Sequence, residues 1–197
     1  EKWFSSNARY AAFFIVMAVT DPDAAPYKRM SMFIVPADTQ GVEIKRNLTF
    51  YGEPEATHAY MAYKQVRVPK ENMLGGRGDA FVVAQVRLGG GRLHHAMRTV
   101  AQAGRALEMM CERALSRTTK GELLARKQMV QEKIADSWVQ LRQFRLLVLE
   151  TAWLCDQGHD YKAVRKNIAA VKAVMPQVLH DISARALHLH GSLGLST

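Results

Sequence analysis

The stretch Val66–Gly76, with the sequence VRVPKENMLGG, marks the point at which the chain changes its kind of secondary structure. Before it, apolar residues run together or alternate with polar ones, in segments that end at Asp, Pro or Gly. That pattern is typical of strands in an antiparallel sheet. After it, apolar residues recur every three or four positions, which is the period of an amphipathic α-helix.

Three long helical patterns follow, separated by short segments that contain Gly121 and Gly158. We therefore predict an α+β fold, with an antiparallel β-domain over residues 1–72 and a bundle of long up-and-down helices over residues 73–197. Pro176 lies inside the third pattern and should kink or interrupt that helix. Three helices rarely bury all of their apolar faces, so a fourth helix or another subunit is expected to complete the bundle.

Composition sets the broad class. With 197 residues, 48% hydrophobic and 23% charged, the chain is globular, and no apolar run approaches the length of a membrane span. Cys111 and Cys155 lie in helical patterns, which predicts inert core thiols in a reducing, cytoplasmic setting. The chain starts without an initiator Met or a signal peptide, which predicts a further segment upstream.

The net charge of +9 favours an anionic partner. No basic run is interleaved with aromatic residues, so we expect no nucleic acid. A dinucleotide or a coenzyme A ligand is compatible with the charge, which alone does not identify either.

The run Gly89–Gly91, followed by Arg92, is unusual inside a helical pattern because each glycine costs up to about 1 kcal/mol relative to alanine. One interpretation is a ligand close to the backbone, with Arg92 as its anion partner. The other is a plain break between two shorter helices. The spacing leaves both open.

Other chemistry is poorly supported. His94 and His95 are adjacent, so on a helix they point in different directions, and His188 and His190 fail the same test. No metal site, catalytic triad or Rossmann fingerprint is expected. The segment WFSSN, residues 3–7, is either a core strand or an aromatic face for a planar cofactor.

Several short segments form an ordered set along the whole chain: KWFSSNA at 2–8, TDP at 20–22, VRVPKENMLG at 66–75, LGGGR at 88–92 and LHLHGSLG at 187–194. In this order they resemble the motifs of the acyl-CoA dehydrogenase family of flavoproteins, from its middle β-domain to its C-terminal helical domain. The run GRLHHAMR and the serine pair at 5–6 resemble a subgroup of long acyl-CoA dehydrogenases, sometimes fused to a phosphotransferase-like domain.

The resemblance implies an FAD enzyme that oxidises an acyl-CoA thioester to the trans-2-enoyl-CoA and passes electrons to an electron-transfer flavoprotein. It also implies a homodimer or homotetramer with FAD held across a subunit interface. The compartment would be the cytoplasm, or the mitochondrion or peroxisome in a eukaryote. Two alternatives stay open: a relative that reoxidises with oxygen, such as an acyl-CoA oxidase or a nitroalkane-oxidising enzyme, and a non-catalytic scaffold.

The resemblance also implies roles for individual residues. Phe4 would pack on the flavin ring, Ser6 would bond near flavin N5, and Arg92 would support the catalytic base. Substrate would lie against Gly90 and Gly91. The adenosine-diphosphate part of a neighbour's FAD would contact Arg117, Gln128, His188 and Gly191. Lys120 and His188 depart from the family's usual Phe and Gln. The family's catalytic carboxylate would lie beyond residue 197, so this chain alone should be inactive.

Overall fold

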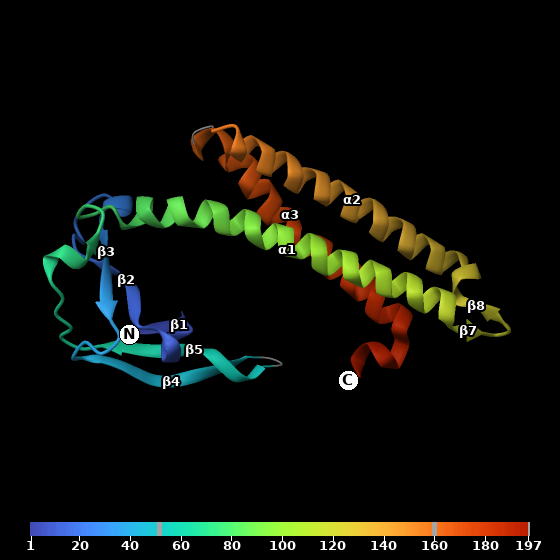
Figure 1. The fold of residues 1–197 in the computed structure, drawn as a ribbon, viewed down its shortest axis with the longest axis horizontal. Helices are drawn as coiled ribbons and strands as arrows, with labels where there is room; N and C mark the ends of the chain where they lie inside the picture. Colours follow the sequence, from blue (N-terminus) through green and yellow to red (C-terminus); the bar gives the residue numbers. More distant parts are fainter. Residues whose placement is uncertain (51–52, 159–160, 197) are drawn as a thin grey trace. The chain divides into compact units, whose positions relative to one another are not determined.

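The computed structural model describes residues 1–50, 53–158 and 161–196. The chain forms two compact units, residues 1–86 and 87–197. Antiparallel strands occupy the first unit and three long helices dominate the chain after it (Figure 1). The predicted α+β class is confirmed.

The first unit contains two three-stranded antiparallel sheets. In one, β5 (Glu53–Tyr63) lies between β1 (Lys2–Ser6) and β4 (Val42–Phe50). In the other, β3 (Met30–Pro36) lies between β2 (Phe13–Val19) and β6 (Met73–Leu74). A small core of Ala8, Ala59 and Met61 lies under the first sheet, with Phe14, Val42 and Tyr63 packed against it.

Strand β1 is irregular where a flavin-facing residue was predicted. Its register against β5 shifts between Lys2 and Ser5, and Phe4 has a left-handed φ of 57°. A regular two-residue alternation therefore does not describe the pairing of β1 at Phe4. Their burial still alternates, since Ser5 between them is buried while both flanking side chains are exposed.

The alternating pattern of residues 60–68 does not form one strand. Strand β5 ends at Tyr63, and Gln65 adopts a left-handed φ of 51°. The Lys64 N–H still donates to Gly41 O at 2.8 Å, and the left-handed backbone of Gln65 then turns the chain out of the sheet. The alternation at 64–68 belongs to a linker.

The three predicted helices are confirmed as α1 (Ala80–Ser116), α2 (Gln128–Asp156) and α3 (Tyr161–His190). Helix α3 continues through Pro176 without a break. The interpretation of the glycine run as a helix break is wrong, because α1 passes through it. Buried side chains from all three helices form the core of the second unit, including Ala103, Met110, Phe144, Val148, Val171 and Ile182.

Helix α2 keeps large apolar side chains on its surface. Trp138, Leu146, Leu149 and Trp153 are all exposed in this chain. This agrees with the expectation that a further helix or subunit completes the bundle. None of the helices in the described part of the chain is long and apolar enough to cross a membrane.

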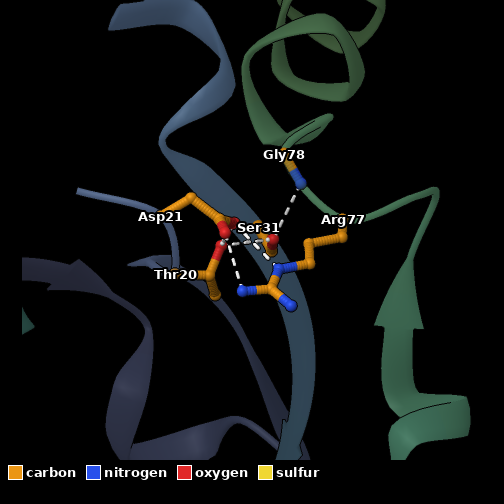
Figure 2. A network of polar contacts seen from close by, with 5 residues as sticks. All are labelled: Thr20, Asp21, Ser31, Arg77 and Gly78. Carbon is orange, nitrogen blue, oxygen red and sulfur yellow. Dashed lines mark hydrogen bonds and ion pairs between the residues drawn. The ribbon is translucent and has the colours of Figure 1, made fainter. Parts of the chain in front are cut away.

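A polar network attaches the start of α1 to the sheet β2–β3 (Figure 2). The Arg77 guanidinium donates to both carboxylate oxygens of Asp21, at 2.9 and 2.6 Å. Thr20 shares a hydrogen bond with Ser31, and the Gly78 N–H donates to the Ser31 Oγ at 2.9 Å. Ser31 is fully buried, so it links the strand to the helix entry in a place that water does not reach.

Gly78 is required at this entry by its backbone. Its φ is +80°, and a Cβ there would lie 2.8 Å from the carbonyl oxygen of Lys28. A side chain at this position would therefore be both strained and in collision with the main chain.

Replacing Ser31 with alanine should lower the free energy of unfolding by about 1–3 kcal/mol, because the Gly78 N–H would be left buried without its acceptor. Denaturant unfolding at neutral pH measures this. Ser116→Ala is the matched control: its hydroxyl donates to Arg113 O on an exposed helix end, and we expect a change within about 0.5 kcal/mol. Equal losses in the two variants would contradict the role given to Ser31.

The Asp21–Arg77 pair should make stability depend on pH in acid. Hydrogen bonds from Arg77 and Thr20 hold the pKa of Asp21 below its ordinary value of 3.8. A depressed pKa stabilises the fold above the unfolded-state pKa of about 3.9 and loses that contribution as pH falls through the folded-state pKa. The stability difference between the wild type and Asp21→Asn should stay constant from neutral pH to about 5 and narrow below about 4. Melting curves over this range test the prediction, and a constant difference down to the lowest pH would refute it.

Candidate flavin and substrate sites

The first predicted site lies on β1. Phe4 is 54% exposed and Trp3 is 51% exposed, and their rings are 6.1 Å apart. Trp3 is held by the Tyr60 ring at 4.9 Å. Two large aromatic side chains on a surface, beside the exposed Ser6 hydroxyl, fit a planar ligand with polar edges.

Charged groups flank this aromatic surface. The Arg46 guanidinium lies 5.4 Å from the centre of the Trp3 ring. Tyr60 donates a hydrogen bond to Glu1, which raises the pKa of the Tyr60 phenol. The contacts with Tyr60 and Arg46 hold the Trp3 indole in place.

The second predicted site is the glycine run of α1. Gly89 is buried and Gly90 is exposed. A Cβ built on Gly90 meets nothing within 4 Å, and one on Gly91 meets only the end of the flexible Arg87 side chain, at 2.7 Å. Nothing described in this chain therefore requires glycine at 90, although the helix would be more stable with alanine there.

Arg92, directly after the glycines, is half-buried and lines a groove of about 580 Å³ with residues of α3. The other cations of this groove are Arg165, Lys166 and Lys172. Sequence reasoning found Arg92 but missed these three, because α3 lies far from Arg92 along the chain and only packing brings it near.

The third predicted site lies at the other end of the bundle, where α1 passes into α2. Arg117 follows the last residue of α1 and precedes a two-stranded hairpin of β7 (Thr118–Thr119) and β8 (Glu122–Leu123). Lys120 and Gly121 have φ values of 50° and 83°, as a two-residue hairpin turn of type I′ requires. Lys120 thus occupies a strained left-handed position, where the resembled family usually has Phe.

The main chain of Arg117 holds this hairpin in place. Its N–H donates to Arg113 O at 3.1 Å and its carbonyl accepts from Leu124 N at 2.9 Å. The Arg113 Nε is buried, with no hydrogen-bond partner in the described part of the chain. Two arginines one helical turn apart therefore give this end of the bundle a concentrated positive charge.

Gln128 and His188 meet in a groove of about 450 Å³ beside this hairpin. Gln128 is the first residue of α2 and His188 lies near the end of α3. Lys127 and Lys133 also line the groove, and sequence reasoning did not single them out. Gly191 ends α3 with a left-handed φ of 64°, three residues after His188.

The predicted residues thus form separate groups. Gln128 and His188 line the same groove. Arg117 lies beside it, because the Arg117 carbonyl accepts a hydrogen bond from the N–H of Leu124, which lines the groove. Arg92 lies 24 residues before the end of α1 at Ser116, a helical distance of about 36 Å. Among the described residues, no group of His, Cys, Asp and Glu could hold a metal ion.

Comparison with known proteins shows the family. Residues 1–66 match the model of the acyl-CoA dehydrogenase middle domain, and residues 78–197 match that of the acyl-CoA dehydrogenase C-terminal domain. The chain belongs to the acyl-CoA dehydrogenase family.

Two curated relatives cover almost the whole chain. It is 42% identical over 198 residues to "Probable acyl-CoA dehydrogenase FadE2" of Mycobacterium tuberculosis, covering 99% of this chain and 48% of that protein. It is 38% identical over 200 residues to mouse "Acyl-CoA dehydrogenase family member 10", covering all of this chain and 19% of the relative. The chain therefore spans half or less of the length of these relatives.

Solved structures share the fold. Butyryl-CoA dehydrogenase from Megasphaera elsdenii is 28% identical with a TM-score of 0.88, over 99% of this chain and 50% of that one. The FAD complex of PigA is 22% identical with a TM-score of 0.89, over 97% of this chain and 49% of that one, and it shows likeness of fold alone.

Proposed function

We propose that this chain is the flavin-binding and helical part of an FAD-dependent acyl-CoA dehydrogenase, which forms a trans-2-enoyl-CoA and passes electrons to an electron-transfer flavoprotein. The observation that carries the proposal is the exposed aromatic and hydroxyl surface of β1 in a chain of this family. Bound FAD would supply the acceptor for the hydride that leaves the β-carbon.

Phe4 and Ser6 would hold the isoalloxazine end of the cofactor. Phe4 offers an exposed ring face, while the adjacent Ser5 is buried. Ser6 offers a hydroxyl that is exposed beside it, able to hydrogen-bond to the ring edge. These residues orient the ring and keep one of its faces from water.

Arg117, Gln128, His188 and Gly191 would bind the adenosine-diphosphate part of the FAD of another subunit. The exposed tryptophans of α2 offer apolar surface for a homodimer or homotetramer. An arginine suits a pyrophosphate because its planar guanidinium makes paired charge-assisted hydrogen bonds.

The substrate thioester would lie along the glycine run, with Arg92 as a supporting group for the base. The base itself would be a carboxylate outside residues 1–197, so the chain alone should not turn over. Both cysteines are free thiols, which supports a reducing compartment such as the cytoplasm, or a mitochondrial or peroxisomal location in a eukaryote.

Ser6→Ala in the full-length protein should slow flavin reduction by acyl-CoA about tenfold, because a hydrogen bond that stabilises the developing charge is lost. Binding of acyl-CoA should change less. Rapid-mixing spectroscopy measures the reduction rate, and a substrate titration measures the affinity.

Ser5→Ala is the control for this experiment. Ser5 is the adjacent hydroxyl on the same strand, but it is buried and faces the other way. It should lower stability and leave the reduction rate within about twofold. Unchanged reduction in Ser6→Ala, or an equal slowing in Ser5→Ala, would count against the proposed role.

The reaction itself is tested by product and acceptor. Full-length protein incubated with acyl-CoA and an electron-transfer flavoprotein should accumulate the 2-enoyl thioester. Hydrogen peroxide formation in air at the same rate would indicate an oxidase, and a protein that retains no flavin would indicate a scaffold.

A further inference from the structure

A small polar pocket lies between the middle of α1 and α3. Its volume is about 130 Å³, and its described lining consists of His95, Arg98, Thr99, Gln102 and Met175. Sites for drug-sized molecules occupy about 300–1,000 Å³, so this pocket is too small for a nucleotide and has room for one small polyatomic ion. Every polar side chain of this lining can donate a hydrogen bond, and none of the five is an acid.

The hydroxyl of Thr99 distinguishes this pocket from an ordinary hollow in the surface. Thr99 is only 3% exposed, yet its hydroxyl makes no hydrogen bond to a residue that the structure describes. A buried hydroxyl on a helix can bond to the carbonyl four residues earlier. The other two buried hydroxyls on the described helices, Ser137 and Thr151, both do so at 2.7 Å. Thr99 is therefore the exception among three similar side chains.

The unpartnered hydroxyl of Thr99 opens on the pocket. Within the described residues, the one fully enclosed side-chain nitrogen or oxygen without a hydrogen-bond partner is the Arg113 Nε. The Thr99 hydroxyl is thus not enclosed, and its opening is the pocket that it lines. Met175, which packs against the core of the three helices, supplies the apolar part of the wall. A group that accepts a hydrogen bond from Thr99 would offset the cost of burying this hydroxyl.

Arg98 supplies the positive charge of the pocket. Its guanidinium makes no ion pair with any described residue. The planar fork of an arginine suits two oxygens of a carboxylate or a phosphate group. The amide of Gln102 and the ring N–H of His95 add uncharged donors beside it.

We propose that this pocket binds one small oxyanion, a carboxylate or a phosphate group. The anion would accept hydrogen bonds from Arg98 and from the buried Thr99, with the exposed His95 and Gln102 at its rim. The proposed function gives these four residues no role, so the inference adds a binding site to α1 beyond the glycine run.

Two sources can supply this anion. One is a free ion in solution. The other is an anionic group on the acyl chain of the substrate, and this source rests on the proposed function. His95 and Thr99 lie three and seven residues after Arg92, on the same side of α1. Since seven residues of helix span about 10 Å, an acyl chain that starts beside Arg92 and lies along α1 would bring its far end to the pocket.

Inorganic phosphate tests the free ion. Its binding to FAD-loaded full-length protein is measured by calorimetry at constant ionic strength. Thr99→Val should weaken phosphate binding about tenfold, and Arg98→Gln more than about tenfold, because each removes a donor to a charged group. Thr99→Val should keep the wild-type Tm without phosphate, since the hydroxyl that it removes has no partner. A purely structural role of Thr99 would lower the Tm instead.

Thr151→Val and Arg145→Gln are the matched controls. Thr151 is a buried hydroxyl of α2 that already has a partner in Leu147 O, and Arg145 is an exposed arginine of the same helix. Both variants make the same chemical change outside the described lining of the pocket, and both should leave phosphate affinity within about twofold.

Pairs of acyl-CoA thioesters test the substrate as the source. In each pair the chain length is equal, and one chain ends in a carboxylate while the other ends in a methyl group. An anion that belongs to the substrate makes the wild type prefer the carboxylate at one chain length. Arg98→Gln should then weaken binding of that thioester about tenfold and change binding of its methyl partner less than about twofold.

Either result supports the pocket and identifies the source of its anion. The inference is overturned if the wild type binds phosphate no more tightly than Arg98→Gln does and also discriminates between the paired thioesters no better. That outcome leaves the proposed function standing, because oxidation of a methyl-ended thioester does not need the pocket. A wild type that retains no flavin contradicts the proposed function, while phosphate calorimetry on the same protein still tests the pocket.

Discussion

Arg117→Ala should weaken FAD binding by about 10- to 100-fold, because a guanidinium that pairs with a pyrophosphate contributes about 1.5–3 kcal/mol. The structure explains why the side chain is available for this. The main chain of Arg117 is used by the hairpin, while its exposed guanidinium makes no hydrogen bond or ion pair within the described residues. Flavin content and particle size are measured together on the full-length protein, and the oligomer should be preserved.

Arg126→Ala controls for a loss of positive charge near the same hairpin. Arg126 is exposed and ends a short 3-10 helix, Leu124–Arg126, before α2. It should retain its flavin. A monomeric wild type that holds FAD as tightly as any oligomer would contradict the bridging role of Arg117. So would equal flavin loss in Arg117→Ala and Arg126→Ala.

Gly90→Leu should abolish acyl-CoA binding, with a loss of more than about 100-fold, while the fold remains intact. The described part of this chain places nothing within 4 Å of a Cβ at Gly90. A larger side chain therefore meets no internal obstacle and obstructs only what lies outside the helix. Gly90→Ala should even stabilise the helix, by about 0.5–1 kcal/mol.

Ala101→Leu is the control for added bulk on α1. Position 101 is exposed and lies three turns further along the same side of the helix. The Ala101→Leu variant should bind acyl-CoA with an affinity close to that of the wild type. If Gly90→Leu binds acyl-CoA normally, the glycines serve neither a ligand nor a helix break, since α1 continues through them.

The helices could be predicted from sequence because each buries one continuous stripe, and the three- and four-residue period survives even at Pro176. The strands were harder to delimit. The register shift at Phe4 depends on pairing with β5, which is distant in sequence. The end of β5 at Tyr63 follows from the left-handed backbone of Gln65, although the alternation of side chains continues beyond it.

The sites show the same limit. Arg92 could be found because it follows a glycine run that stands out in a helix. Its companions Arg165, Lys166 and Lys172 look like ordinary solvated cations until α3 packs beside α1. The spacings of four and three residues from Arg165 to Ala169 and Lys172 were the one available signal. The Ser31–Gly78 hydrogen bond left no signal in the sequence, because an isolated serine in a strand belongs to no recognisable pattern.

The central claim is that bound flavin accepts electrons from an acyl-CoA thioester. The most direct measurement is an anaerobic titration of the full-length protein with acyl-CoA, followed through the visible absorption band of oxidised flavin. We predict that the purified protein shows this band and that stoichiometric acyl-CoA bleaches it, with the 2-enoyl thioester as the product. A protein without the band, or a band that acyl-CoA leaves unchanged, would contradict the account.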